Sequence, residues 1–478
     1  MPLSRPTRIR HALLLALTAT SPAMAAQTVT IEDLARRLQA LEQRLDAAPV
    51  AAVPSDASQV DPAELDQRLR ILERKLELQA EEASAKAATQ PTVKLDDKGL
   101  SVKSASPGGF EVKFRGLLQG DGRFFFGDAH PDNTFLLRRV EPGIEGSWGS
   151  LLGFRLNAQL AGDSATVNDA YFDLKFDPRA TVRIGRYKGP VGLERLQSSG
   201  STAQIETGFP SELVPNRDVG VQLQGEFARS TVSYVLGVYN GAPDGRDGFT
   251  TNPDDDFELA GRVFLEPWKN SDGPLSGLGF GLGASRGEKH GNGNNFLPRY
   301  RTPGQVTFFN YLGGVDADGE HVRWSPQAYY YRNAFGLLGE YVASRQDVLL
   351  PATGQRESLA NRAWQLSAGW VLTGEDADYK GVAAPDHPFT ADGTGWGAFE
   401  LVARYGELEI DDDAFPLFAD PFASASRARS WGVGLNWYLT RNFKLMGNYT
   451  RTAFEGGAAD GVDRDDEETF FTRAQFSF

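Results

Sequence analysis

The sequence predicts an all-β protein: a sixteen-stranded antiparallel transmembrane β-barrel with an N-terminal helical coiled-coil segment. Across residues 110–478, apolar and polar residues alternate with a period of two in about sixteen stretches, each long enough for a tilted spanning strand of roughly ten residues. The connections between these stretches are alternately short and long, which is typical of a bacterial outer-membrane barrel. A segment with the features of a secretory signal peptide begins the chain.

Composition narrows the classes of function. The chain has 478 residues, a formal net charge of −14, five histidines and no cysteine. The lack of cysteine excludes disulfides, thiolate metal sites and a cysteine nucleophile. The acidic balance argues against nucleic-acid binding, which needs lysine and arginine to displace phosphate counterions. A mean hydropathy of −0.37 argues against a helical membrane protein. It does not exclude a membrane β-barrel, because barrel strands carry only one apolar residue in two. We expect no enzyme activity, no cofactor and no metal.

Residues 1–26 have the features of a signal peptide. Arg5, Arg8 and Arg10 precede an apolar run at 11–20, which is too short to span a bilayer. Residues 23–25, Ala-Met-Ala, form a small-x-small cleavage pattern. The alternative is an N-terminal anchor helix. Export, together with the predicted barrel, places the chain in the bacterial outer membrane.

The segment 27–90 is predicted to be a periplasmic coiled coil with a proline-containing linker. Its apolar residues step by three and four at Ile31, Leu34, Leu38, Leu41 and Leu45, and again at Leu65, Leu69, Leu72 and Leu76. Pro49 and Pro54 interrupt this pattern within 47–61. Helices this short are marginal alone in water, so we expect association with other copies; the alternative is one helix folding back on the other. Residues 91–109 are expected to link this segment to the barrel.

The strand stretches have one apolar and one polar face. Val219, Val221 and Leu223 alternate with Gly220 and Gln222, for example. In a soluble sandwich the apolar face would form a core, whereas in a barrel it faces lipid and the polar face lines the lumen. The connection lengths favour the barrel. Aromatic residues near the strand ends are expected to form girdles at the membrane surface, namely Trp148, Trp268, Trp437 and Tyr438.

Two features do not follow from the barrel pattern alone. Gly277, Gly279, Gly281 and Gly283 fall on one face of a strand. Glycine weakens a strand but permits another segment to approach closely. Either a segment packs against this wall from inside, or the strand is flexible and the closed barrel holds it in place. The connection 374–394 is long although it lies on the side of short turns, and the pattern does not explain it.

Five stretches of the chain resemble the phosphate-selective porin family, the porin O/P group. They are 135–141 (FLLRRVE), 184–194 (IGRYKGPVGLE), 364–380 (WQLSAGWVLTGEDADYK), 397–404 (GAFELVAR) and 431–438 (WGVGLNWY). Phe478 is similar to the terminal aromatic residue that barrel-assembly machinery reads in such proteins. The resemblance implies a homotrimer of sixteen-stranded barrels, each a passive channel. It also implies that the third external loop, here 188–216, folds inward to narrow the pore.

The resemblance also implies an arginine-lined anion pathway. Guanidinium offers paired donors to phosphate and stays charged, and binding must be weak or multi-site for the ion to leave. The pathway residues expected here are Arg138, Arg139, Arg195, Arg299, Arg301 and Arg115.

Each of these arginines has its own relation to the family pattern. Arg138 and Arg139 match a paired arginine of the pore lining, and Arg195 stands where the family has a lysine. Arg299 and Arg301 match the first two steps of an arginine staircase in the fifth external loop, but Pro303 stands at the third step and no arginine follows. The family's first-strand arginine aligns with Leu117, and Arg115 lies two residues before that position. The family's central pore aspartate aligns with Asn168. Each arginine could instead be a solvated side chain paired with a neighbouring acid.

We therefore predict an outer-membrane porin for passive diffusion of small anions, including phosphate or polyphosphate. The expected partners are two further copies in a homotrimer, outer-membrane lipid and lipopolysaccharide, small anions, and peptidoglycan through the coiled coil. One alternative is a weakly selective general porin, and the missing staircase arginines are the feature that distinguishes it from a phosphate-selective one. The other is a structural tether between outer membrane and cell wall.

Overall fold

The computed structural model describes residues 62–106, 108–127, 131–162 and 164–478. The chain divides into two units, residues 1–90 and residues 91–478. The predicted signal peptide and the first half of the predicted coiled coil lie outside the described residues. In the first unit, the described part is one helix, α2 (Pro62–Thr89), which carries the second leucine repeat. Within the described part of the chain, no helix has the length and apolar character needed to cross a membrane.

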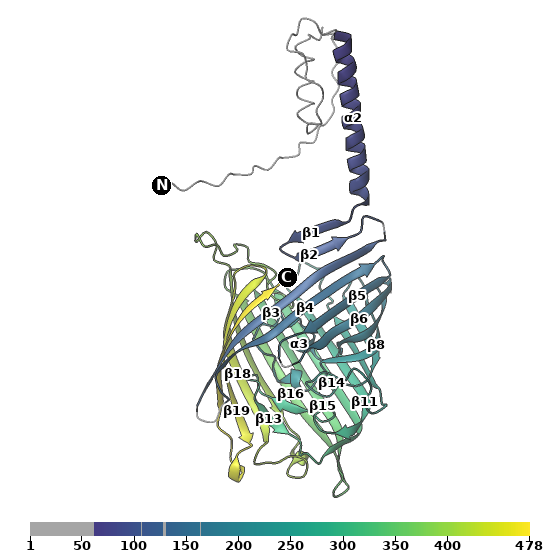
Figure 1. Cartoon of the computed structure of the whole chain (residues 1–478). Helices are drawn as coiled ribbons and strands as arrows, with labels where there is room; N and C mark the ends of the chain where they lie inside the picture. Colours follow the sequence, from purple (N-terminus) through teal and green to yellow (C-terminus); the bar gives the residue numbers. More distant parts are fainter. Residues whose placement is uncertain (1–61, 107, 128–130, 163) are drawn as a thin grey trace. The chain divides into compact units, whose positions relative to one another are not determined.

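The second unit is a closed antiparallel barrel of sixteen strands, which confirms the barrel part of the predicted fold class (Figure 1). The N-terminal coiled coil is not confirmed and stays a prediction. Each strand pairs with its neighbours along the chain, and β20 pairs with β3 to close the ring, from Ser477 opposite Leu117 to Glu468 opposite Phe126. The barrel strands are β3 (Phe110–Phe126), β4 (Thr134–Trp148), β5 (Leu152–Gln159), β6 (Thr166–Asp177), β7 (Ala180–Lys188), β8 (Arg217–Phe227), β9 (Val232–Tyr239), β10 (Glu258–Leu265), β11 (Leu278–Asn292), β14 (Asp316–Arg332), β15 (Phe335–Leu350), β16 (Gln355–Val371), β17 (Ala398–Glu409), β18 (Ala425–Tyr438), β19 (Phe443–Gly456) and β20 (Glu467–Ser477).

The connections alternate in length as predicted. Short turns join β4 to β5, β6 to β7 and β14 to β15 on the side of the barrel where the C-terminus lies. Three longer connections on the other side are named here L3 (189–216), L4 (240–257) and L5 (293–315). L3 contains α3 (Leu193–Leu196) and η1 (Phe209–Glu212), and L5 contains the hairpin β12 (Arg299–Arg301) and β13 (Thr307–Asn310). Two further short helices, η2 (Asp412–Ala414) and η3 (Ala459–Gly461), lie in later connections of the same side.

The barrel is apolar outside and polar inside. On β8, Val221 is 48% exposed whereas its neighbour Gln222 is 4% exposed, and on β18 Leu435 is 45% exposed whereas Asn436 is fully buried. A soluble sandwich would bury the apolar face instead. An exposed apolar band of this kind fits lipid, so the alternation identifies a membrane-spanning wall around a polar lumen.

The predicted aromatic girdle is only partly correct. Trp148 and Trp268 are exposed near strand ends, as expected for side chains at a membrane surface. Tyr438 is buried and donates a hydrogen bond to the lumenal Glu400 at 2.8 Å. Its assignment to the girdle was wrong, because the alternation along β18 turns Trp437 outward and therefore Tyr438 inward.

Residues 91–109, where a linker was expected, contain a hairpin. Strands β1 (Thr92–Asp96) and β2 (Gly99–Lys103) pair with each other, and β2 pairs with the beginning of β3. The loop of this hairpin accepts hydrogen bonds from Arg115 and Asn442 through the carbonyl groups of Lys98 and Asp97, at 3.0 and 2.8 Å. The hairpin therefore belongs to the barrel unit and covers the edge of β3 that β20 leaves unpaired.

The glycine-rich strand confirms that a segment packs against this wall from inside. Gly283 faces the lumen, and a Cβ atom built there would lie 2.4 Å from the carbonyl oxygen of Val191 in L3. No side chain fits this space without displacing the L3 backbone.

Candidate functional site

L3 crosses the lumen and is fixed to the opposite wall, as the resemblance implied. The amide of Leu193 donates to Glu340 on β15 at 2.5 Å, and the amide of Ile205 donates to Asn448 on β19 at 2.7 Å. Gln119 on β3 donates to the carbonyl of Ser199 at 3.0 Å. Since these partners come from distant strands, L3 divides the lumen and narrows it at this depth, which is named here the constriction.

The local fold of L3 depends on one buried carboxylate. Glu194 accepts hydrogen bonds from the Gly208 amide at 2.8 Å and from Gln365 at 2.9 Å, and it pairs with Arg404 at 3.2 Å. It thereby joins α3 to the start of η1 and both to the barrel wall. A buried carboxylate is stable only when paired in this way.

The long connection 372–397, unexplained by the sequence, also reaches L3. Tyr379 accepts a hydrogen bond from Gln197 through its backbone carbonyl at 2.6 Å, and its hydroxyl donates to the carbonyl of Leu193 at 2.5 Å. Its ring stacks on Tyr329 of β14 at 5.2 Å between centroids. This connection therefore supports L3 from the side of the short turns.

Glu206 of L3 is the centre of an ion-pair cluster at the constriction. Arg138 forms a bidentate pair with it at 2.7 and 3.0 Å. Arg123 lies 2.7 Å and Arg473 3.4 Å from the same carboxylate. Burial alone would raise the pKa of Glu206, but Arg138, Arg473 and Arg123 hold this pKa well below its ordinary value. Glu206 therefore stays ionised and neutralises part of the arginine charge.

A β-bulge explains how Arg138 and Arg139 both reach the lumen. Adjacent strand residues normally point to opposite faces. The register of β3 and β4 shifts here, because Gln119 pairs with Arg139 and Gly120 pairs with Leu137. Arg138 is the extra residue, and the bulge turns its side chain inward beside that of Arg139.

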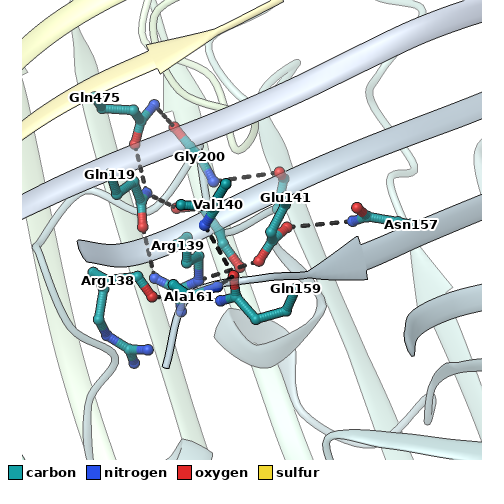
Figure 2. Close-up of polar contacts among 12 residues, drawn as sticks. Gln119, Arg138, Arg139, Val140, Glu141, Asn157, Gln159, Ala161, Gly200 and Gln475 are labelled. Carbon is teal, nitrogen blue, oxygen red and sulfur yellow. Dashed lines mark hydrogen bonds and ion pairs between the residues drawn. The ribbon is translucent and has the colours of Figure 1, made fainter. Parts of the chain in front are cut away.

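Arg139 belongs to a polar network separate from Glu206. Figure 2 shows it between Gln119, whose Oε1 accepts its hydrogen bond at 2.8 Å, and Glu141, whose carboxylate lies 3.5 Å away. Gln119 in turn donates to Gln475 of β20 at 2.8 Å. Among the described residues, the Arg139 guanidinium has no close bidentate carboxylate partner, so it is less completely neutralised than that of Arg138.

Arg195 and Arg301 face the same space from L3 and L5. Arg301 pairs with Glu212 at 3.3 Å, whereas Arg195 donates to the carbonyl of Ser211. The Nε atom of Arg195 is buried and has no hydrogen-bond partner among the described residues. With Arg138 and Arg139 they line a cavity of about 250 Å³, named here the constriction cavity. Asn168, at the family's aspartate position, lines it too.

Two predicted pathway residues lie elsewhere. Arg299 is exposed on β12 and does not line the constriction cavity. Arg115 pairs with Glu145 at 2.8 Å and lines a cavity nearer the short turns. The structure therefore brings four of the six predicted arginines together.

Sequence reasoning missed two cations of the constriction cavity. Lys188 and Arg217 pair with each other in register at the ends of β7 and β8, where L3 leaves and rejoins the wall. Lys188 donates to the Gln197 carbonyl at 2.5 Å, and Arg217 pairs with Asp169 at 2.9 Å. The sequence could have predicted both residues, because residues that flank an inward-folded loop lie where that loop meets the barrel wall.

The lumen between L3 and the short turns is more strongly cationic. Two cavities of about 410 Å³ each, named here the vestibule, occupy this part. In each, five cationic side chains face two carboxylates. They are Arg155, Arg183, Lys188, Arg217 and Arg262 against Glu141 and Asp169 in one cavity, and Arg115, Arg155, Lys380, Arg441 and Lys444 against Glu141 and Glu145 in the other.

L4 and L5 are fixed to the wall by a fully buried cluster. Asp244 of L4 accepts hydrogen bonds from Arg323 at 2.5 Å, Ser344 at 2.7 Å and Tyr300 of L5 at 3.2 Å. Burial would raise the pKa of Asp244, but Arg323 and His321 hold it at about 2. This cluster keeps L5, and therefore Arg301, in place.

Comparison with solved structures gives the fold. OmpT of Vibrio cholerae is 12% identical, over 81% of this chain and 100% of its own, with a TM-score of 0.50. Salmonella typhi OmpF in complex with daunomycin is 13% identical, over 77% of this chain and 98% of its own, also at 0.50. An anion-selective porin from Comamonas acidovorans is 13% identical, over 77% and 100%, at 0.47.

Sequence comparison gives the family. No curated protein sequence matches the chain. The family model for phosphate-selective porins O and P matches residues 110–478, the whole barrel. The chain therefore belongs to the porin O and P family and is a porin of the bacterial outer membrane.

Proposed function

We propose that this porin lets small anions diffuse passively through the outer membrane, with modest selectivity and without strong retention of phosphate. The observation that carries the proposal is the cationic excess of the vestibule, five cations against two carboxylates in each cavity. Fixed charge in a narrow wet lumen raises the local concentration of counterions. The net charge of −14 does not oppose this, because selectivity depends on the pore lining.

The pairing of the arginines argues against a tight phosphate site. Arg138 is neutralised by Glu206 and Arg301 by Glu212. Phosphate would have to displace these carboxylates before it could form its own bidentate pairs. The third staircase position is Pro303, which has no cationic group.

Three cations of the constriction cavity remain available to a passing anion. Lys188 and Arg195 donate to backbone carbonyls, which carry no full charge. Arg139 has its nearest carboxylate at 3.5 Å. They form a weak multi-site path from the constriction to the vestibule, and weak sites let the ion leave.

The assembly proposed with this function is a homotrimer. The outer faces of β3 to β6 carry large exposed apolar side chains, including Phe110, Phe114, Phe135, Leu137 and Phe172. Such an apolar wall is compatible with cover by another copy of the barrel as well as by lipid. The leucine stripe of α2 fits association of the same copies through a coiled coil, because one such helix alone is marginal in water. Peptidoglycan contact through this segment stays a prediction.

Single-channel recording in KCl with increasing phosphate tests the proposal. We expect chloride current to fall only slightly in millimolar phosphate, because no unpaired arginine staircase holds the ion. Saturable block at micromolar phosphate would contradict the modest selectivity. A protein that inserts but carries no current would favour the structural tether.

A further inference from the structure

A charged band lies on the outer surface of the barrel, on β16 to β19. Named here the outer rim, it consists of Arg362, Glu407, Glu409, Arg427, Arg429, Arg451 and Glu455. These residues alternate along their strands with buried lumenal residues, so their side chains point away from the lumen. They take no part in the constriction cavity or the vestibule.

The position of the outer rim relative to the bilayer follows from its neighbours. On the same outward face, an aromatic residue stands two residues from each of three arginines, toward the middle of the strand. Trp364 follows Arg362, Trp431 follows Arg429, and Tyr449 precedes Arg451. Exposed apolar residues such as Val433 and Leu435 come next on β18. Aromatic residues mark the boundary between hydrocarbon and headgroups. The rim therefore lies at the headgroup level, on the side of the long loops, which is the outer leaflet.

Strand register arranges the rim as rows of alternating charge. Arg362 is opposite Glu409, Glu409 is opposite Arg427, and Arg427 is opposite Glu455. Arg427 lies 2.7 Å from Glu455 and 3.0 Å from Glu409. Arg429 lies 2.8 Å from Glu407 and 2.6 Å from Glu455. Arg451 pairs with two further carboxylates, Asp466 at 2.8 Å and Glu468 at 3.4 Å. These pairs orient the guanidinium groups of Arg427, Arg429 and Arg451 along the barrel surface.

Donors remain free in this arrangement. The side chain of Arg362 is exposed and forms no hydrogen bond or ion pair with any described residue. Arg429 is 44% exposed and uses Nε and one terminal nitrogen for its pairs, which leaves the other terminal nitrogen unused. Strand β17 alone separates the strands of these two residues, and Arg429 is displaced by two residues along β18 from the position level with Arg362. Their backbones therefore lie roughly 12 Å apart.

From these observations we propose that the outer rim binds the phosphorylated headgroup of an outer-leaflet glycolipid, with one phosphate on Arg362 and another on Arg429. Guanidinium groups recognise phosphate through paired hydrogen bonds. Beyond the side chains of the barrel itself, an outward charge at headgroup depth meets headgroups and water. The rim carboxylates orient the arginines and limit the strength of binding, and a divalent cation shared with the phosphate relieves their repulsion. The proposal requires the barrel but not its anion preference.

The test measures lipid retained by the purified full chain. The porin is exchanged into detergent micelles that contain either a diphosphorylated glycolipid or its enzymatically dephosphorylated form, and bound lipid per barrel is measured by native mass spectrometry. We expect retention of the phosphorylated form only. The double variant Arg362→Gln with Arg429→Gln should weaken retention by about tenfold or more. Arg362→Gln alone removes no described contact, so it keeps the fold and should still reduce retention.

Matched controls decide between explanations. Arg179→Gln removes an exposed arginine from a short turn at the other end of the barrel and should retain lipid like the parent. Channel conductance should be unchanged in the double variant, which separates failure of this proposal from failure of the anion proposal. Glu407→Gln with Glu409→Gln should increase retention when divalent ions are chelated. Equal retention of both lipid forms, or equal retention by the double variant, would overturn the proposal.

Discussion

Substitution of Glu206 by glutamine should increase anion selectivity. Glu206 is the only carboxylate paired with Arg138 among the described residues. Arg123 and Arg473 keep Asp121 as a second partner, at 3.3 and 2.7 Å. The substitution therefore frees one guanidinium at the constriction and leaves the other two paired. L3 keeps its remaining tethers, including the 2.7 Å bond from Ile205 to Asn448.

The size of the effect follows from one unit of charge. A charge about 4 Å from a passing ion in a water-filled pore changes its energy by about 1 kcal/mol. Since 1.4 kcal/mol corresponds to tenfold, anion partition should rise about fivefold and cation partition should fall by a similar factor. The effect should shrink as the Debye length shortens to about 3 Å in 1 M salt.

Zero-current potentials in planar bilayers measure this change. The Glu206→Gln variant and the parent are compared across a KCl gradient at low and at high mean salt concentration. Glu357→Gln, which removes an exposed carboxylate at the outer end of β16, is the matched control and should behave like the parent. A Glu206→Gln channel with unchanged or more cation-selective potential would refute the assignment of Arg138 to the anion path.

Four further predictions test other parts of the account. Arg301→Ala should lower anion preference whereas Arg299→Ala should leave it nearly unchanged, because only Arg301 lines the constriction cavity; equal effects in bilayer recordings would show that the cavity is misassigned. Gly283→Val should displace L3, since its Cβ would lie 2.4 Å from the Val191 carbonyl oxygen, and single-channel conductance should change, whereas parental conductance would show that L3 does not pack there. Asp244→Asn should destabilise the barrel by about 3 kcal/mol, because it removes one partner of the buried Arg323; the temperature at which the folded form disappears on electrophoretic gels measures this, and an unchanged temperature would exclude that role. The pKa of Asp244 is about 2 in the folded chain, below the 3.8 of an ordinary aspartate, so its stabilisation is complete above pH 4 and is lost only as the pH falls toward 2; a loss of stability centred at pH 5 to 6 that Asp244→Asn abolishes would contradict this.

The barrel could be predicted because its strands are specified by the alternation of apolar and polar residues within short stretches of the chain. Alternation along each strand records which side chains meet lipid and which meet water, so strand number and connection lengths are visible in the chain itself. Tyr438 was misassigned because its position near a strand end was considered without the parity of β18. The hairpin in 92–103 was missed because its strands are short and take their stability from β3.

The candidate site was predictable only in part, since it depends on contacts distant in sequence. The pair Arg138 and Arg139 was found, but the bulge that turns both inward requires the register with β3. Neutralisation of Arg138 by Glu206 joins β4 to the tip of L3, 68 residues later. Arg299 was predicted with Arg301, yet residues two apart on one strand can face different surroundings when the strand belongs to an inserted loop.

The sign of the zero-current potential across a tenfold KCl gradient tests the central claim most directly. A cationic lumen should let chloride pass more readily than potassium, so the parent channel should show an anion-selective potential of modest size. A potential of the opposite sign would show that the acidic side chains control permeation and would contradict the account.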